Sequence, residues 1–107
     1  MKLYHPDRDE IELSGVLHAL SDPQRLHIVR LLAAQQEPVP CGSLELGVTK
    51  STATHHFRVL REAGVIQQSP IGTTKLTALR RADLDARVPG LLDAVLAASP
   101  ATATAAT

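Results

Sequence analysis

Hydrophobic positions recur at helical spacing in the first part of the chain, after a polar start. Apolar residues three and four positions apart fall on one face of a helix. We therefore predict a first helix over about residues 8–20. Its apolar positions are Ile11, Leu13, Val16, Leu17 and Leu20.

A second helix is predicted directly after the first. Ser21 or Asp22 can cap its free backbone amides, and Pro23 suits its first turn. Gln24 can complete a capping box with Ser21. The following run, RLHIVRLLAA, is too apolar for a helix with a single buried face. We therefore expect a central, buried helix, which the stretch QQEPVP ends.

A helix-turn-helix unit is predicted next. The stretch CGSLEL is long enough for only a short third helix, which would end at Gly47. Thr49 can cap a fourth helix over about residues 50–63, and Gly64 is its stop signal. A short helix, a turn containing glycine and a longer helix together form such a unit.

A β-hairpin and a last helix complete the predicted fold. The strand-like segments VIQQS and TTKLTAL surround the turn signal PIG, which predicts a small hairpin acting as a wing. The stretch RRADLDARVPGLLDAVLAA returns to a helical pattern, with Pro89 at a favourable first-turn position. The fold class is thus mostly α with a small β-hairpin, a winged helix-turn-helix in which four helices precede two strands and a fifth helix. We expect this domain to cover residues 1–98, and residues 99–107, which contain nothing larger than Thr or Pro, to be a disordered tail.

The fourth predicted helix has two different faces. At about 100° per residue, Ala53, Phe57 and Leu60 share the side expected to face the core, with His56 at its margin. The opposite side is rich in short hydroxyl side chains. Such a surface can approach the floor of a DNA groove closely and form hydrogen bonds with base edges.

Longer cationic side chains extend this surface toward the end of the same helix, where Arg58 and Arg61 suit DNA phosphates. We expect the helix to contact double-stranded DNA. The residues assigned to that contact are Lys50, Ser51, Thr52, Thr54, His55 and Arg58.

The adjacent histidines raise the alternative of a metal site. His55 and His56 are about 100° apart around the helix, so they cannot bind one ion as a pair four residues apart could. We expect His55 to face the groove. His56 is expected to be partly buried and hydrogen-bonded to the hairpin or to the neighbouring helix.

Basic charge is concentrated around the predicted helix and wing, although the 107-residue chain has a net charge of zero. Residues 46–81 carry six basic side chains and one acidic side chain, a net charge of +5. The segments before and after them are acidic, at −3 and −2. A local basic excess of this kind favours a polyanionic partner. The aromatic residues are only Tyr4 and Phe57, too few for a surface that stacks single-stranded bases.

Other classes of function lack sequence support. We find no glycine-rich phosphate loop, nucleophile elbow or pair of carboxylates, so we expect neither an enzyme nor a bound cofactor. The start of the chain lacks the apolar segment of a signal peptide, and no stretch is long enough to span a membrane. The single cysteine, Cys41, excludes an internal disulfide and fits a cytoplasmic protein without a membrane partner.

Two side-chain groups leave further alternatives. Cys41, near the start of the short third helix, is either a reactive thiol or a plain buried side chain. His5 with Asp7, Asp9 and Glu10 is either a terminal metal site or a solvated polar end. In each case the second interpretation is the simpler one.

Two stretches, ALSDPQRLHIVRLLA and KSTATHHFRVLREAGVI, resemble the ArsR-type winged-helix repressors. The second helix of that family begins with Leu-x-Asp-Pro-x-Arg-Leu, and its recognition helix reads Ser-Thr-x-Ser-His-His-x-x-x-Leu-Arg-Glu-Ala-Gly. The resemblance covers about residues 11–98 and implies a homodimeric repressor on a pseudo-palindromic operator. It implies that Lys50, Ser51, Thr54 and His55 contact bases or the groove, and that Lys75 lies on the wing and contacts DNA.

The resemblance also implies that the first and last helices form the dimer interface. Both helices carry more apolar surface than one small core can absorb. We expect the interface to bury Leu13, Val16 and Leu17 against Leu92, Val95 and Leu96.

The sequence departs from the family at its usual metal sites. Metal sensors of the family carry a Cys-x-Cys pair on the third helix, or Asp and His pairs on the last helix. Here the first region offers only Cys41 and the last helix only Asp93. We therefore expect no metal at either site. The alternative function is a winged-helix module that binds another protein, and the basic surface argues against it.

Overall fold

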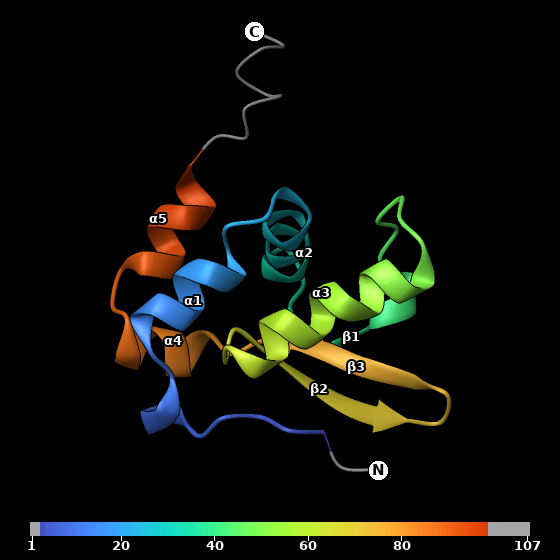
Figure 1. Ribbon diagram of the computed structural model, residues 1–107, viewed down its shortest axis with the longest axis horizontal. Helices are drawn as coiled ribbons and strands as arrows, with labels where there is room; N and C mark the ends of the chain where they lie inside the picture. The colour runs from blue at the N-terminus through green and yellow to red at the C-terminus, as the bar shows by residue number, and fades with distance from the viewer. Residues whose placement is uncertain (1–2, 99–107) are drawn as a thin grey trace, which may run out of the picture.

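The computed structural model describes residues 3–98, which form helices around a small antiparallel sheet (Figure 1). A 3-10 turn, Arg8–Glu10, precedes α1 (Leu13–Ala19) and α2 (Pro23–Ala33). The short β1 (Val39–Pro40) and a second 3-10 turn, Cys41–Ser43, lead to α3 (Lys50–Glu62). The chain continues through β2 (Ile66–Ile71), β3 (Thr74–Leu79), α4 (Arg81–Arg87) and α5 (Leu91–Ala97). The mostly helical prediction with a small sheet is confirmed, whereas the predicted tail lies outside the described residues.

The first helix is shorter than predicted. Residues 8–10 form a separate turn, and the backbone of Ile11 is extended, so its side chain, 1% exposed, enters the core. A Cβ atom at Gly64 would lie 2.5 Å from Cγ1 of Ile11. Gly64 therefore has two roles, because its φ of +87° also ends α3 in the left-handed conformation that favours glycine.

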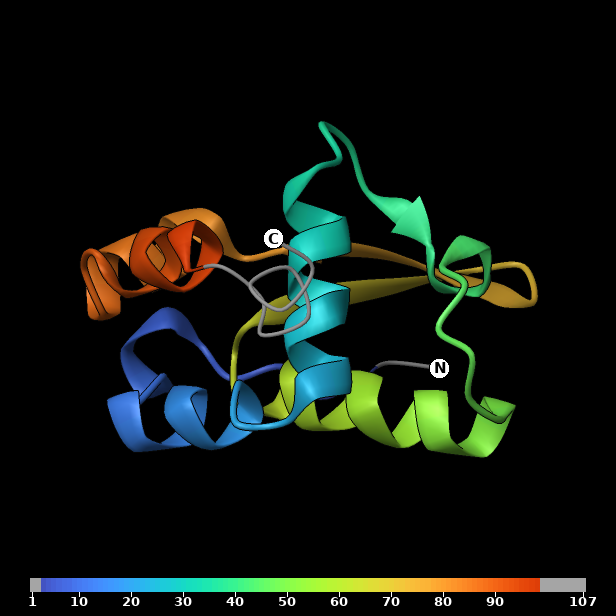
Figure 2. The same ribbon diagram turned by 90° about the horizontal axis from the view of Figure 1, so that it is seen from above.

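The predicted start of the second helix is confirmed, and Asp22 is its cap. The Asp22 carboxylate accepts hydrogen bonds from the backbone N–H groups of Gln24 (2.8 Å) and Arg25 (3.1 Å). Ser21 instead donates its hydroxyl to the carbonyl of His18. Figure 2 shows α2 crossing the middle of the molecule, where Ile28, Val29 and Leu32 are buried.

The short third helix predicted for CGSLEL is wrong. Only Cys41–Ser43 are helical, as one 3-10 turn, and the chain then runs irregularly to Thr49. A stretch this short gains few helical hydrogen bonds, and Gly42 and Ser43 favour helix weakly. A single 3-10 turn therefore stands where the first helix of the helix-turn-helix unit was predicted.

The wing, defined as β2 and β3 with their connecting turn (residues 66–79), extends further than predicted. Pro70 and Ile71, expected in the turn, pair with Lys75 and Thr74 in the ladder. A third strand, β1, pairs with β3 and was not predicted because it has only two residues. The strand order is β1-β3-β2, so β2 lies at an edge of this sheet.

The last predicted helix is divided in two. α4 ends at Arg87 and α5 begins at Leu91, after Gly90 with a φ of +83°. Pro89 disfavours helical backbone at Val88, so it lies between the helices instead of in a first turn. Among residues 3–98, no helix is both long and apolar enough to cross a membrane.

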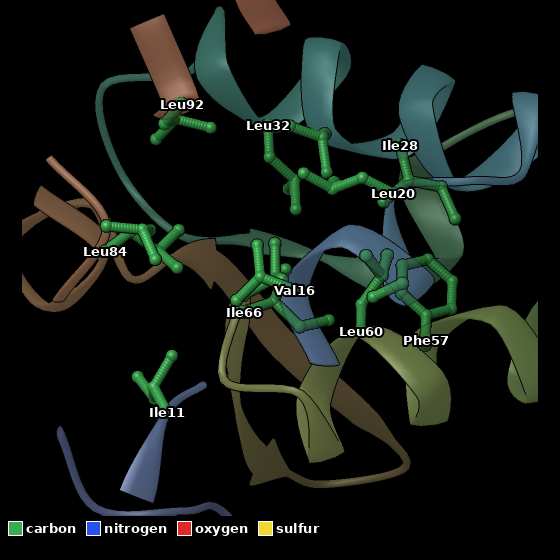
Figure 3. Close-up of a cluster of buried hydrophobic side chains, with 14 residues drawn as sticks. Ile11, Val16, Leu20, Ile28, Leu32, Phe57, Leu60, Ile66, Leu84 and Leu92 are labelled. Carbon is green, nitrogen blue, oxygen red and sulfur yellow. The ribbon is translucent and has the colours of Figure 1, made fainter. Parts of the chain in front are cut away.

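A single core joins these elements (Figure 3). Side chains from α1, α2, α3, β2, α4 and α5 meet there. The largest fully buried hydrophobic residues are Ile11, Val16, Ile28, Val29, Leu60, Val65, Ile66 and Leu84. The core therefore holds α3 against α1, α2 and the sheet and leaves its other face free.

Candidate nucleic-acid interface

The first turn of α3 is capped by Thr49. Its hydroxyl oxygen accepts a hydrogen bond from the N–H of Thr52 (3.2 Å) and also lies 2.9 Å from the Thr52 hydroxyl. This arrangement satisfies a backbone amide that the helix itself leaves free. Thr52, assigned to DNA contact from the sequence, is exposed but takes part in this cap.

The two faces of α3 differ in burial. Phe57 and Leu60 are buried in the core, as predicted, and Ala53 is half-buried. The side chains assigned to DNA contact on this helix lie on its solvent side. The exposed residues are Lys50, Ser51, Thr52, Thr54, His55 and Arg58.

The two histidines differ in exposure, as predicted. Their ring centroids are 5.7 Å apart and the rings are tilted by 53°, but His55 is exposed whereas His56 is only 8% exposed. Nδ1 of His56 lies 3.2 Å from Nη1 of Arg25 on α2, which confirms a hydrogen bond to the neighbouring helix. The pair does not present two ring nitrogens to one ion.

The two arginines expected to suit phosphates have different surroundings. Arg58 is exposed and pairs with Glu62 one turn later, with Nε 3.3 Å from the carboxylate. Such an exposed pair contributes little and opens easily. Arg61 is half-buried, and its guanidinium donates to the carbonyl of Tyr4 and to the side chain of Gln68. Arg58 is therefore available to a phosphate, whereas the hydrogen bonds of Arg61 connect α3 to Tyr4 and to Gln68 on β2.

Lys75 lies near the tip of the wing, on β3, and is half-buried. It borders a cleft of about 250 Å³ that separates the wing from the start of α3. Lys50 and Thr54 line the same cleft from the helix side. In Figure 1 the start of α3 and the tip of the wing lie at the same end of the molecule. The two basic side chains can therefore face one ligand.

Asp22 connects the start of α2 to the buried histidine. Its carboxylate lies 3.9 Å from Nε2 of His56. Burial raises the pKa of the Asp22 carboxyl, but the N–H groups of Arg25 and Gln24 and the charge of Arg25 outweigh it. The pKa of Asp22 consequently lies below the ordinary value for aspartate, so it stays ionised at neutral pH.

The residues assigned to a dimer interface fall into two groups. Val16 and Leu92 are 1% and 2% exposed and belong to the core of this chain. Leu13 and Leu17 are about half exposed on α1. Val95 and Leu96 on α5 are partly buried. The surface available to a second copy is therefore narrower than predicted.

The groups behind the alternatives left open by the sequence have the following surroundings. Within residues 3–98, no group of three or more histidine, cysteine or acidic side chains is arranged to bind a metal. His5 is hydrogen-bonded to Leu3 and Gln68. Cys41 is half-buried beside the cleft, in a 3-10 turn too short to supply a helix dipole.

Sequence reasoning missed two features. Ile71, at the tip of the wing, is 54% exposed, and its place inside the turn signal PIG was the available clue. Arg25, 8% exposed, was not singled out from the sequence, although it lies in the first turn of α2, two residues after Pro23. A charged residue in an apolar helix was the signal that could have found it.

Comparison with known proteins identifies the class. A helix-turn-helix domain model matches residues 20–68, from the end of α1 into the wing. The HTH-type transcriptional regulator YceK of Bacillus subtilis (strain 168), itself named as uncharacterized, is 35% identical over 80 residues, which are 73% of this chain and 80% of that protein. The chain belongs to the helix-turn-helix transcriptional regulators.

A second relative of this regulator matches a shorter part of the chain. The HTH-type transcriptional regulator MJ1325 of Methanocaldococcus jannaschii, also named as uncharacterized, is 34% identical over 59 residues. These residues are 54% of this chain and 66% of the relative. Membership of this class supports a DNA-binding regulator of transcription.

Proposed function

We propose that this regulator is a homodimeric ArsR-type repressor that binds a pseudo-palindromic operator in double-stranded DNA. The observation that carries the proposal is the solvent face of α3, where small hydroxyl side chains and His55 lie near Lys75 of the wing. Small side chains allow close approach to the floor of the major groove. The core packing of Phe57 and Leu60 holds the helix rigid for that approach.

The side chains divide into two roles under this proposal. Ser51, Thr54 and His55 are short enough to form hydrogen bonds with base edges. Lys50, Arg58 and Lys75 are long cations toward the flanks, where the phosphates lie. Thr52 acts mainly in the cap at the start of the helix, where its N–H donates to the Thr49 hydroxyl.

Dimer formation follows from the apolar surface of α1. Leu13 and Leu17 lie one turn apart and remain half exposed. Val16 of α1 and Leu92 of α5 line one small apolar cleft, so the two helices are neighbours. Partly buried Val95 and Leu96 extend this surface, and a two-fold axis there would present two recognition helices to half-sites about one helical turn apart, or a multiple.

Release of the DNA does not use the metal sites of metal-sensing relatives in this proposal. The region of Cys41 and the last helix lack the paired cysteine, histidine and acidic ligands that such ions prefer. Titration of the protein–DNA complex with zinc, cobalt, nickel or arsenite is expected to leave its affinity unchanged. Stoichiometric metal binding that releases the DNA would refute this part of the proposal.

The deciding experiment is recovery of DNA from a pool of genomic fragments by the purified protein, followed by salt titration of the recovered fragment. Binding to phosphates releases counterions, so the logarithm of affinity must fall linearly and steeply with the logarithm of salt concentration. Enrichment of one palindromic sequence with this salt dependence supports the proposal. Absence of enrichment would favour the alternative, a winged helix that binds another protein.

A further inference from the structure

The segment before the first turn, residues 3–7, lies along the free edge of β2, and we call it the N-terminal arm. The ring nitrogen Nε2 of His5 accepts a hydrogen bond from the backbone N–H of Gln68 (3.0 Å). Alternate residues of an edge strand point their N–H groups outward, and the next outward position is Pro70, which has none. His5 therefore satisfies an outward donor of the wing.

The same part of the wing is tied to the recognition helix. Arg61 of α3 donates to the side-chain oxygen of Gln68 (2.8 Å) and to the carbonyl of Tyr4 in the arm (3.2 Å). The side-chain Nε2 of Gln68, a residue only 3% exposed, donates in turn to the hydroxyl of Thr77 on β3. Arm, recognition helix and both strands of the wing thus share one hydrogen-bond network.

The network requires a neutral imidazole at His5. A backbone N–H can only donate, so Nε2 must carry a lone pair. The other nitrogen, Nδ1, lies 3.1 Å from the carbonyl of Leu3 and must carry the proton. A second proton on the ring would occupy Nε2 and turn the contact with Gln68 into one between two donors.

We propose that His5 is a positioning residue for the wing: its neutral ring holds the arm against β2 and fixes the wing relative to α3, and protonation releases this contact and weakens DNA binding. The proposal rests on the proposed function, because it assumes that α3 and the wing bind one DNA duplex together. It adds regulation of DNA binding by pH through His5, which lies outside the DNA-facing surface.

The charged groups around His5 favour the neutral ring. Burial lowers the pKa of His5 below its ordinary value, the hydrogen bond to Leu3 opposes this, and the positive charges of Arg61 from α3 and Arg80 before α4 lower it further. On the β2 side the neighbour is the uncharged Gln68. The ring therefore stays neutral at physiological pH and takes up a proton only in acid.

The arm has a second attachment that does not respond to the same change. Arg8 and Arg80 donate to the Asp83 carboxylate at 2.6 and 2.9 Å, and Arg80 also donates to the carbonyl of Pro6 (2.7 Å). The hydrogen bond from Arg8 lowers the pKa of Asp83, burial opposes it, and Arg80 lowers it further. Asp83 stays ionised while His5 titrates, so Pro6 stays attached. The loss is confined to the contact of His5 with Gln68, because the carbonyl of Tyr4 still accepts from Arg61.

The contact is tested directly by hydrogen exchange of the Gln68 amide in the isotope-labelled protein. Protection is expected at neutral pH and is expected to be lost in acid, below the ordinary range of histidine. His5→Gln keeps an acceptor but cannot titrate, so its Gln68 amide should stay protected at both pH values. His27→Gln, which changes an exposed histidine on α2, should behave as wild type. Equal protection in wild type and His5→Ala would overturn the proposal.

The effect on DNA is measured with the fragment that the wild-type protein recovers, by fluorescence anisotropy at both pH values. At neutral pH, His5→Ala is expected to bind about fivefold more weakly, the order of effect of one hydrogen bond, while His5→Gln matches wild type. In acid, His5→Gln should still bind DNA more tightly than His5→Ala, whereas wild type should bind DNA as weakly as His5→Ala. Affinity that is equal in all three proteins at both pH values would overturn the positioning role. If wild type recovers no DNA at neutral pH, the proposed function fails, whereas the exchange experiment still decides the contact.

Discussion

Nη1 of Arg25 donates a hydrogen bond to Nδ1 of His56 over 3.2 Å, and both residues are less than one-tenth exposed. A guanidinium has no acceptor, so Nδ1 must be unprotonated and the remaining ring proton lies on Nε2, toward Asp22. Arg25 also donates Nε–H to the carbonyl of Ala19 (2.7 Å). One buried side chain, Arg25, thus joins α1, α2 and α3.

Replacement of His56 by alanine is expected to destabilise the protein by about 2–4 kcal/mol, because it leaves a cavity and a buried charged donor without its acceptor. Urea unfolding followed by circular dichroism measures this loss. His55→Ala, which changes the exposed neighbour, should alter stability by less than about 0.5 kcal/mol. Equal losses in the two variants would contradict the role assigned to the Arg25–His56 hydrogen bond.

Asp22 should give the protein a dependence of stability on pH. Because the pKa of this carboxyl is lowered in the folded state, its contribution is fully present above the ordinary aspartate pKa and is lost as pH falls through the lowered value. Asp22→Ala should cost about 1 kcal/mol at neutral pH, the usual effect of losing a helix cap, and the difference should shrink in acid.

Asp22→Asn is the matched control for this prediction. Asparagine is an equally good helix cap but carries no titrating group. Its unfolding free energy should fall less in acid than that of wild type, because the contribution of Asp22 is removed while that of Asp83, whose pKa is also lowered, remains. Urea unfolding at several pH values measures the difference. A wild-type slope that persists unchanged in Asp22→Asn would show that other carboxyl groups produce it.

His55 and Lys75 should affect DNA binding differently. His55→Ala is expected to cost about 1–3 kcal/mol on the operator and to relax its sequence preference, because a base contact is lost. Lys75→Ala should weaken binding to operator and scrambled DNA equally and reduce the salt slope by about one unit, because a phosphate contact is lost. Binding of both variants to both DNAs across salt concentrations makes the comparison. If His55→Ala weakens binding to both DNAs equally and Lys75→Ala weakens binding to the operator alone, Lys75 makes the base contact and His55 the phosphate contact.

Leu13 should be needed for the proposed dimer. Sedimentation at micromolar concentration is expected to give twice the chain mass for wild type. Leu13→Glu places a charge on the exposed apolar surface of α1 and should give a monomer that remains folded, because Leu13 is 53% exposed in the single chain. Ser14→Glu adds the same charge to the neighbouring exposed position and should remain a dimer. A wild-type monomer would refute the dimer.

The bounds and the inner face of α3 could be predicted almost completely because its signals are local. Thr49 caps it, Gly64 ends it, and the spacing of Phe57 and Leu60 sets its inner face. The short helix predicted before it was wrong, because helix formation over six residues depends on packing that the pattern does not contain. The division of the last helix at Pro89 was within reach of the sequence, since proline restricts the residue before it.

The sequence by itself determined the second helix, α3 and the two strands of the wing, which face of α3 is polar, and that basic charge gathers around that helix and the wing. These properties depend on neighbours along the chain and on periodicity. Only the tertiary structure decided that Arg25 reaches His56, that Arg61 joins the arm to the wing, and that Val16 and Leu92 belong to the core. Such pairs are distant in sequence, so their contacts arise when the elements pack together and no local pattern records them.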